Sequence, residues 1–152
     1  MTMQTANTVV GWGYEGKSPS DLLEYVVRYG IKTVVDIRLN AVSRKPGFSK
    51  VRLREVLEAA NIKYLHMPEL GNPRDNRTGF SDREGEAGRA ARVRFSDEVL
   101  SKPQARGAIE TLIQLAAGGP LILLCFEDEE LCCHRSLVLD AITNDAVDRV
   151  LA

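Results

Sequence analysis

The chain has 152 residues, of which 44% are hydrophobic and 27% are charged, and its formal net charge is −1. This composition is typical of a globular domain and excludes an intrinsically disordered chain, while the near-neutral charge argues against broad, non-specific binding of nucleic acid. No apolar run approaches the ~18 residues that a membrane-spanning helix needs.

The N-terminal residues and the cysteines indicate a cytoplasmic protein. Residues 1–7 contain neither the basic nor the apolar part of a secretory signal peptide. The cysteines are odd in number and two are adjacent (Cys125, Cys132 and Cys133), which is a poor basis for a disulfide framework and fits a reducing cytosol. Since no repeat or linker interrupts the chain, we expect one soluble domain over residues 1–152, with its core at about 8–143 and no membrane association.

The first elements in chain order are a strand, a helix and a second strand. Residues 8–12 are β-branched and apolar, which predicts a strand. The segment Ser18-Pro19-Ser20-Asp21 predicts a capping box with proline at the first helical position, and Gly30 is a plausible end of that helix. Residues 33–37 predict a buried strand.

The middle of the chain predicts a helix, a short strand and a long loop. A helix beginning at Ser49 is expected to reach Ala60, followed by a third strand over residues 62–66. Residues 67–81 are rich in proline, glycine and asparagine, which predicts a loop. Residues 81–84 (Ser-Asp-Arg-Glu) could cap the next helix.

The last third predicts a helix over residues 101–117, a buried strand over 121–125, a helix over about 133–142 and a short one after Asn144. Strands that alternate with helices in this way indicate a single three-layer α/β domain. We expect a mainly parallel four-stranded sheet flanked by helices, which is a Rossmann-like arrangement.

Polar side chains follow all four predicted strands. In open sheets of this kind, ligands bind beyond the carboxyl ends of the strands. The residues that we expect to line such a pocket are Gly13, Tyr14, Glu15, His66, Glu69 and Cys125. The second strand runs into Asp36 and Arg38, and the fourth leads to Glu127 and the triplet Cys133-His134-Arg135.

The triplet Cys133-His134-Arg135 stands at the predicted start of a helix. A helix N-terminus favours anions and lowers thiol pKa values, so Cys133 could act as a nucleophile beside His134, with Arg135 binding a phosphate or carboxylate. The alternative is that Cys125 and Cys133 are small apolar packing residues and that His134 only caps the helix.

Six basic residues and no acid lie between Ile37 and Arg54. Within this run, Arg38, Arg44 and Lys45 are candidates for binding an anion, although a solvated basic surface would look the same. Asp36 could be a base or nucleophile, or could brace Arg38. His66 could be a general acid or base, or a structural histidine.

Two further interpretations have weaker support. Gly11, Gly13 and Gly16 have the spacing of a dinucleotide-binding fingerprint, but bulky residues crowd the loop. A zinc site from Cys125, Cys132, Cys133, His134 or Glu127 is conceivable, yet adjacent cysteines differ from the usual Cys-x-x-Cys spacing. We therefore assign neither metal ligands nor a cofactor from the sequence.

Five ordered blocks of the sequence resemble domain-of-unknown-function family 488. The blocks are Gly13–Gly16, Asp36–Arg38, Ser43–Ser49, Pro68–Gly71, and Cys125 with Cys133–Arg135. The resemblance runs from about Val9 to Asp140 and implies a shared fold and pocket, but no reaction. The blocks are also faintly similar to rhodaneses and cysteine phosphatases, whose short Cys-x5-Arg loop differs from the interval between Cys125 and Arg135.

These observations favour an enzyme acting on a phosphate-bearing or other anionic substrate, related to nucleotides or nucleic acid. Its candidate catalytic residues are Asp36, Glu127, Cys133 and His134, and its candidate anion-binding residues are Arg38, Arg44, Lys45 and Arg135. The alternatives are a non-catalytic module that binds nucleotides or nucleic acid through the basic run, and a metal- or redox-sensing cysteine domain.

Overall fold

A computed structural model describes the backbone of residues 8–43 and 45–151 and the side chains up to residue 144. Its four-stranded sheet is parallel throughout and has the order β1-β4-β2-β3. The strands are β1 (Val9–Gly13), β2 (Thr33–Asp36), β3 (Lys63–His66) and β4 (Leu121–Cys125). The α-helices are α2 (Pro19–Arg28), α3 (Lys50–Ala59), α4 (Arg77–Phe80), α5 (Glu86–Phe95), α6 (Pro103–Ala117) and α7 (Arg135–Leu151).

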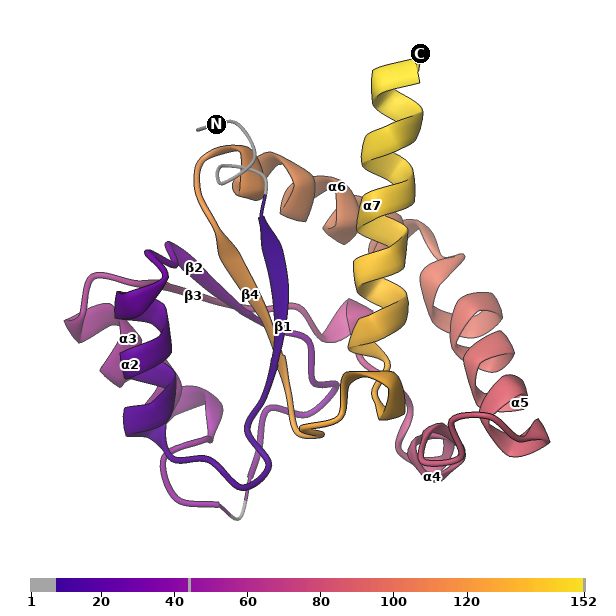
Figure 1. Cartoon of the computed structure of the whole chain (residues 1–152), viewed down its shortest axis with the longest axis horizontal. Coiled ribbons are helices and arrows are strands. Elements are labelled where there is room, and N and C mark those ends of the chain that lie inside the picture. The colour runs from indigo at the N-terminus through magenta and orange to yellow at the C-terminus, as the bar shows by residue number, and fades with distance from the viewer. Residues whose placement is uncertain (1–7, 44, 152) are drawn as a thin grey trace.

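Helices cover both faces of the sheet, which confirms the predicted three-layer α/β fold (Figure 1). Side chains of β4 alternate between the faces. Ile122 and Leu124 pack with residues of α2 and α3, such as Leu22 and Leu53. Leu121, Leu123 and Cys125 pack instead with the buried residues of α5, α6 and α7.

The helix boundaries follow the local chemistry of the sequence in part. The capping box at Ser18 is present, because its hydroxyl accepts a hydrogen bond from Asp21 N while the Asp21 carboxylate accepts one from Ser18 N. Ser49 precedes α3 but makes no side-chain cap bond. The predicted cap at residues 81–84 lies one turn early: Gly85 is the N-cap of α5, and Asp82 accepts a hydrogen bond from Gly85 N.

Two other stretches differ from expectation. The predicted loop over residues 67–81 contains η1 (Pro68–Leu70), η2 (Arg74–Asn76) and α4. This segment is anchored because Leu70 and Phe80 are buried in the core and the Asn76 amide donates to Ala91 O in α5. The two helices expected near the C-terminus are one continuous helix, α7.

The remaining short elements are the π-helical turn η3 (Ser96–Leu100) and η4 (Glu130–Cys132). Among the described residues, no helix combines the length and the apolar character that crossing a membrane would require.

The register of the sheet brings the four strand ends to one edge. Gly13 pairs with Cys125, and Asp36 pairs with both Leu124 and His66. The neighbouring strands β2 and β4 lead to helices on opposite faces, since α3 packs on one face and α7 on the other (Figure 1). Such a point in an open parallel sheet leaves a crevice at the carboxyl ends, where ligands bind.

Candidate functional site

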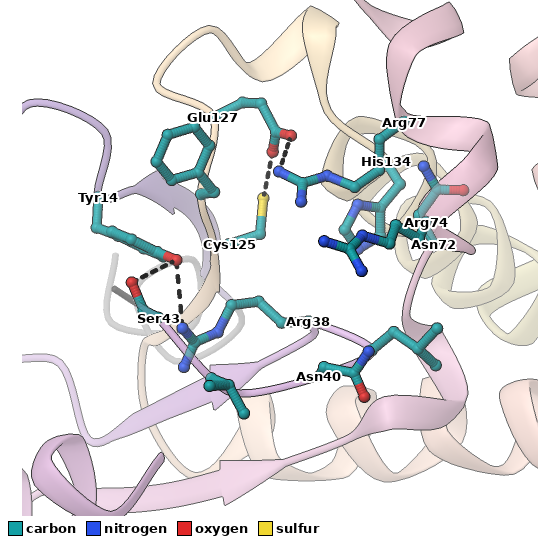
Figure 2. A pocket seen from close by; sticks show the side chains of 13 residues that line it. Tyr14, Arg38, Asn40, Ser43, Asn72, Arg74, Arg77, Cys125, Glu127 and His134 are labelled. Carbon is teal, nitrogen blue, oxygen red and sulfur yellow. Dashed lines mark hydrogen bonds and ion pairs between the residues drawn. The ribbon is translucent and has the colours of Figure 1, made fainter. Parts of the chain in front are cut away.

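A cavity of about 550 Å³ opens at the carboxyl ends of β2 and β4 (Figure 2). Polar side chains surround it: Tyr14, Arg38 and Ser43 lie on one side, Arg74 and Arg77 lie across from them, and Cys125 and Glu127 lie between (Figure 2). Its lining residues are Tyr14, Arg38, Leu39, Asn40, Val42, Ser43, Asn72, Arg74, Arg77, Cys125, Phe126, Glu127 and His134.

The lining contains three arginines against a single glutamate, so the formal charge of the side chains around the cavity is positive. Arg77 donates a hydrogen bond to Glu127 Oε1 over 2.9 Å, and its side chain is half exposed. Arg74 is also exposed, and its guanidinium makes no hydrogen bond or ion pair with the part of the chain that the structure describes. Arg74 is therefore available to a ligand without breaking an existing contact.

Asp36 holds Arg38 in place at the floor of the cavity. The fully buried carboxylate accepts hydrogen bonds from Arg38 N, Nε and Nη2 and from the Tyr64 hydroxyl. Burial acts to lower the pKa of Arg38, but the hydrogen bonds and charge of Asp36 raise it above its ordinary value. Burial and the Asp36 charge together raise the pKa of Tyr64. Asp36 does not line the cavity, so its geometry is that of the bracing role left open by the sequence.

Tyr14 and Phe48 support the other side of Arg38. The Tyr14 ring stacks on Phe48 with centroids 4.5 Å apart, and the Arg38 Nη1 donates to the Tyr14 hydroxyl over 3.3 Å and to Phe48 O over 2.8 Å. Lys45 Nζ donates to Tyr14 O over 3.1 Å. Lys45 thus stabilises the loop and does not line the cavity, and Arg44 lies outside the described residues.

The chain's two histidines bind consecutive carbonyl groups. His66 Nε2 lies 2.8 Å from Arg38 O, and His134 Nε2 lies 2.9 Å from Ile37 O. Burial lowers the pKa of His134 to about 4, so its ring is neutral at pH 7. A neutral ring beside a carbonyl must donate from Nε2, which leaves the Nδ1 of His134 with a lone pair.

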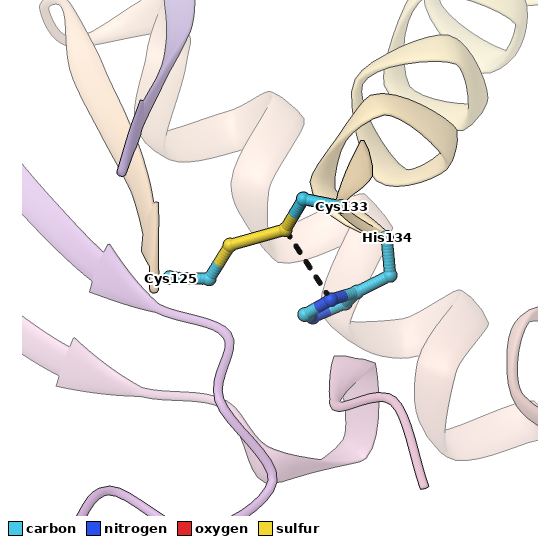
Figure 3. A group of neighbouring side chains, drawn as sticks. All are labelled: Cys125, Cys133 and His134. Atoms are coloured by element: carbon cyan, nitrogen blue, oxygen red, sulfur yellow. Dashed lines mark hydrogen bonds between the residues drawn. A yellow bond between two sulfur atoms is a disulfide. The ribbon is translucent and has the colours of Figure 1, made fainter. Parts of the chain in front are cut away.

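The sulfur atoms of Cys125 and Cys133 are in bonding contact as a disulfide, with Cα atoms 7.8 Å apart (Figure 3). The sequence argued against such a bridge; the fold produces it because the end of β4 packs against the start of α7. Cys133 is 1% exposed and does not line the cavity, so in this arrangement it does not offer a nucleophile to a ligand there. Cys132 is a free thiol outside the pair.

Arg135 is a structural residue in this fold, contrary to its expected role in anion binding. The residue is 1% exposed, and its guanidinium donates to Glu127 O, to Asp128 O over 3.0 Å and to Cys125 Sγ over 3.1 Å. Burial lowers its pKa. Because its donors face the chain, Arg135 holds the loop after β4 in position and does not reach the cavity.

Gly11 and Gly13, which lie within β1, are packed against the chain, whereas Gly16 after the strand has open space around it. A Cβ atom at Gly13 would lie 1.8 Å from Glu127 O, and one at Gly11 would lie 2.1 Å from Glu130 Oε1. Close packing of β1 on the β4 loop thus accounts for both glycines. Glu15 braces the same loop by accepting a hydrogen bond from Asp128 N over 3.1 Å.

Of the candidate site residues, the cavity brings together Tyr14, Arg38, Cys125, Glu127 and His134. The other described candidates do not line it: Gly13, Glu15, Asp36, His66, Glu69, Lys45, Cys133 and Arg135. The sequence missed Arg74 and Arg77, because the segment that carries them was interpreted as an unstructured loop. Two arginines three positions apart, in the segment between β3 and α5, were the available signal.

Comparisons with known proteins place the chain in a family but give no activity. No curated protein and no solved structure matches it. The family profile described as domain of unknown function DUF488 matches residues 18–142, which is most of the chain. The chain therefore belongs to the DUF488 family, as the ordered sequence blocks indicated.

Proposed function

We propose that this protein is an enzyme acting on a phosphate-bearing or other anionic substrate, related to nucleotides or nucleic acid, in the cavity beyond β2 and β4. The observation that carries the proposal is that Arg38, Arg74 and Arg77 face one cavity together with Glu127. A guanidinium group can donate two parallel hydrogen bonds to the oxygens of one phosphate or carboxylate, and several arginines around one cavity often recognise such groups.

Each group has a distinct role in this proposal. Arg74 and Arg77 bind the anionic group, while Arg38, fixed by Asp36, provides a preorganised charge at the floor. Glu127 is the acid or base, because it lines the cavity and is only partly exposed. A substrate anion that draws Arg77 away would release the Glu127 carboxylate for proton transfer.

The basic run gives less support to a nucleic-acid-binding module. Arg38 is buried against Asp36, Lys45 is bonded to Tyr14 O, and Arg54 lies over the Tyr64 ring at 5.4 Å. These contacts divide the run between the interior and separate patches, whereas phosphate tracking needs a continuous charged surface.

Calorimetric titration with inorganic phosphate and with AMP tests the binding half of the proposal. We expect Arg74→Ala and Arg77→Ala each to weaken binding by about 10-fold or more, since a hydrogen bond to a charged group contributes about 1.5–3 kcal/mol. The control is Arg106→Ala, which removes an exposed arginine of α6 that does not line the cavity. Absence of binding to the unaltered chain, or an equal loss in the control, would refute the proposal.

The catalytic half needs a second readout. Phosphate release from a panel of nucleotides and phosphomonoesters should fall at least about 100-fold in Glu127→Gln, the range of a lost general acid or base, while AMP binding persists. Turnover that is unchanged by this substitution would remove Glu127 from the chemistry.

A further inference from the structure

We propose that Cys125, Cys133 and His134 bind a zinc-class divalent metal ion through two sulfurs and Nδ1, with the fourth coordination position open to the cavity. The three donor atoms lie within 4.8 Å of one another and all three residues are buried (Figure 3). This site goes beyond the proposed anion-binding function and does not depend on it.

The spacing of the backbone at the cysteine pair fits a metal bridge. Disulfides usually join residues whose Cα atoms are about 4.4–6.8 Å apart, and the separation here is 7.8 Å. Two thiolates on one tetrahedral zinc ion lie about 3.8 Å apart, compared with about 2 Å in a disulfide. An S–Zn–S bridge is longer than a disulfide and therefore suits a wider backbone separation. Once reduced, the two cysteines are close enough for both sulfurs to bind one ion.

The position of His134 fits the same geometry independently. Tetrahedral ligation with Zn–S near 2.3 Å and Zn–N near 2.0–2.1 Å places sulfur and nitrogen about 3.6 Å apart. The distance between Cys133 Sγ and His134 Nδ1 is 3.6 Å. The hydrogen bond of Nε2 to Ile37 O fixes the tautomer that leaves Nδ1 available, which is how metal-bound histidines are commonly held.

The surroundings compensate the charge and orient the ligands. A divalent ion bound by two thiolates and a neutral imidazole forms a site of zero net charge, and binding releases the two thiol protons. Arg135 Nη1 donates to Cys125 Sγ over 3.1 Å, as outer hydrogen bonds to metal thiolates do. The His134 ring is held at 5.3 Å from the Phe95 ring, edge to face.

The fourth position faces the cavity because Cys125 and His134 both line it, while Cys133 lies behind them. Glu127 Oε2 is 3.7 Å from Cys125 Sγ (Figure 2), which is close enough to accept a hydrogen bond from a water molecule on the ion. Three protein ligands with an open position are the arrangement of catalytic rather than structural zinc sites.

Cobalt titration of the full chain under reducing conditions tests the proposal. We expect one Co²⁺ per chain, an absorption band from thiolate-to-cobalt charge transfer, and loss of both on addition of Zn²⁺. Cys125→Ser and Cys133→Ser should each weaken binding by more than about 100-fold, since even outer-shell substitutions cost 10–100-fold. Cys132→Ser is the matched control and should bind as the unaltered chain does.

The wild-type spectrum decides the outcome even where serine in the core unfolds the chain. A fully reduced chain that shows three reactive thiols but takes up neither cobalt nor zinc would overturn the metal site and leave a dithiol pair. Equal loss of cobalt in Cys132→Ser would overturn the ligand assignment. The arginine variants are tested by their binding of phosphate and AMP, and the cysteine variants by their binding of cobalt. The anion-binding proposal and the metal-site proposal can therefore fail independently.

Discussion

Replacing Asp36 by asparagine should reveal how strongly the floor of the cavity depends on one buried ion pair. The substitution keeps the size of the side chain but removes its charge. In the unaltered chain Arg38 Nη2 lies 2.6 Å from Asp36 Oδ2, and the Arg38 side chain is 7% exposed. In the variant Arg38 would be a buried cation without its counterion. Removing one member of such a pair costs about 3–5 kcal/mol of unfolding free energy.

Urea unfolding followed by circular dichroism measures this loss. With an m-value of about 2 kcal/mol per M, the expected cost lowers the urea midpoint by roughly 2 M. Glu58→Gln is the control, because it removes an equivalent charge from an exposed position on α3 and should change stability by less than about 0.5 kcal/mol. A loss below about 1 kcal/mol in Asp36→Asn would refute the bracing role.

Two further changes probe the rear of the site. With the Cys125–Cys133 disulfide in place and no metal bound, the pKa of His134 is about 4 against 6.5 in the unfolded state. The unfolded state therefore binds more protons, and stability falls as the pH drops from about 6.5 through about 4. Urea unfolding across that range should show a loss of up to about 3 kcal/mol that His134→Gln lacks, and parallel pH profiles would contradict it. Gly13→Ala should lower the melting temperature, because overpacking against Glu127 O costs about 1–3 kcal/mol. Gly107→Ala, in open space on α6, should raise the melting temperature, because alanine stabilises a helix by ~1 kcal/mol relative to glycine. Equal shifts of the same sign in the two variants would show that the close approach of Glu127 O to Gly13 does not exclude a side chain at that position.

The sequence predicted the elements that carry strong local signals. The capping box at Ser18, the run of β-branched and apolar residues in β2 and the apolar run of β4 each depend on residues close together in the chain. The parallel sheet followed from the alternation of strands and helices, and the common edge of the strand ends followed from the parallel sheet. These steps use regular geometry, so composition and periodicity were sufficient.

The cavity's arginines could not be predicted in the same way. Arg74 and Arg77 lie on short helical turns whose position depends on Phe80 reaching the core and on Asn76 bonding to Ala91 O in α5. Those contacts join segments that are distant in the chain, and a segment rich in proline and glycine gives no periodic signal of them. The loop interpretation was therefore wrong where tertiary anchors override weak local preference.

The start of α7 shows why adjacent residues were assigned a common role that the structure divides. Cys133 and Arg135 both contact the Cys125 sulfur, Arg135 also donates to the carbonyls after β4, and His134 binds the Ile37 carbonyl. The direction of each side chain is set by the backbone where the chain enters the helix, and spacing in the sequence does not report it. The same consideration explains the metal ligands, whose eight-residue separation resembles no short motif although the fold closes it.

Both histidines act on the same short segment, which links the two halves of the site. His134 binds Ile37 O and His66 binds Arg38 O, so the backbone that carries Arg38 is held by the residue before α7 and by the end of the neighbouring strand β3. A metal ion on His134 Nδ1 would immobilise the ring whose Nε2 holds Ile37. The position of Arg38 at the cavity floor therefore depends on the cysteine pair, because His134 contacts Cys133 through Nδ1 and the Ile37 carbonyl through Nε2.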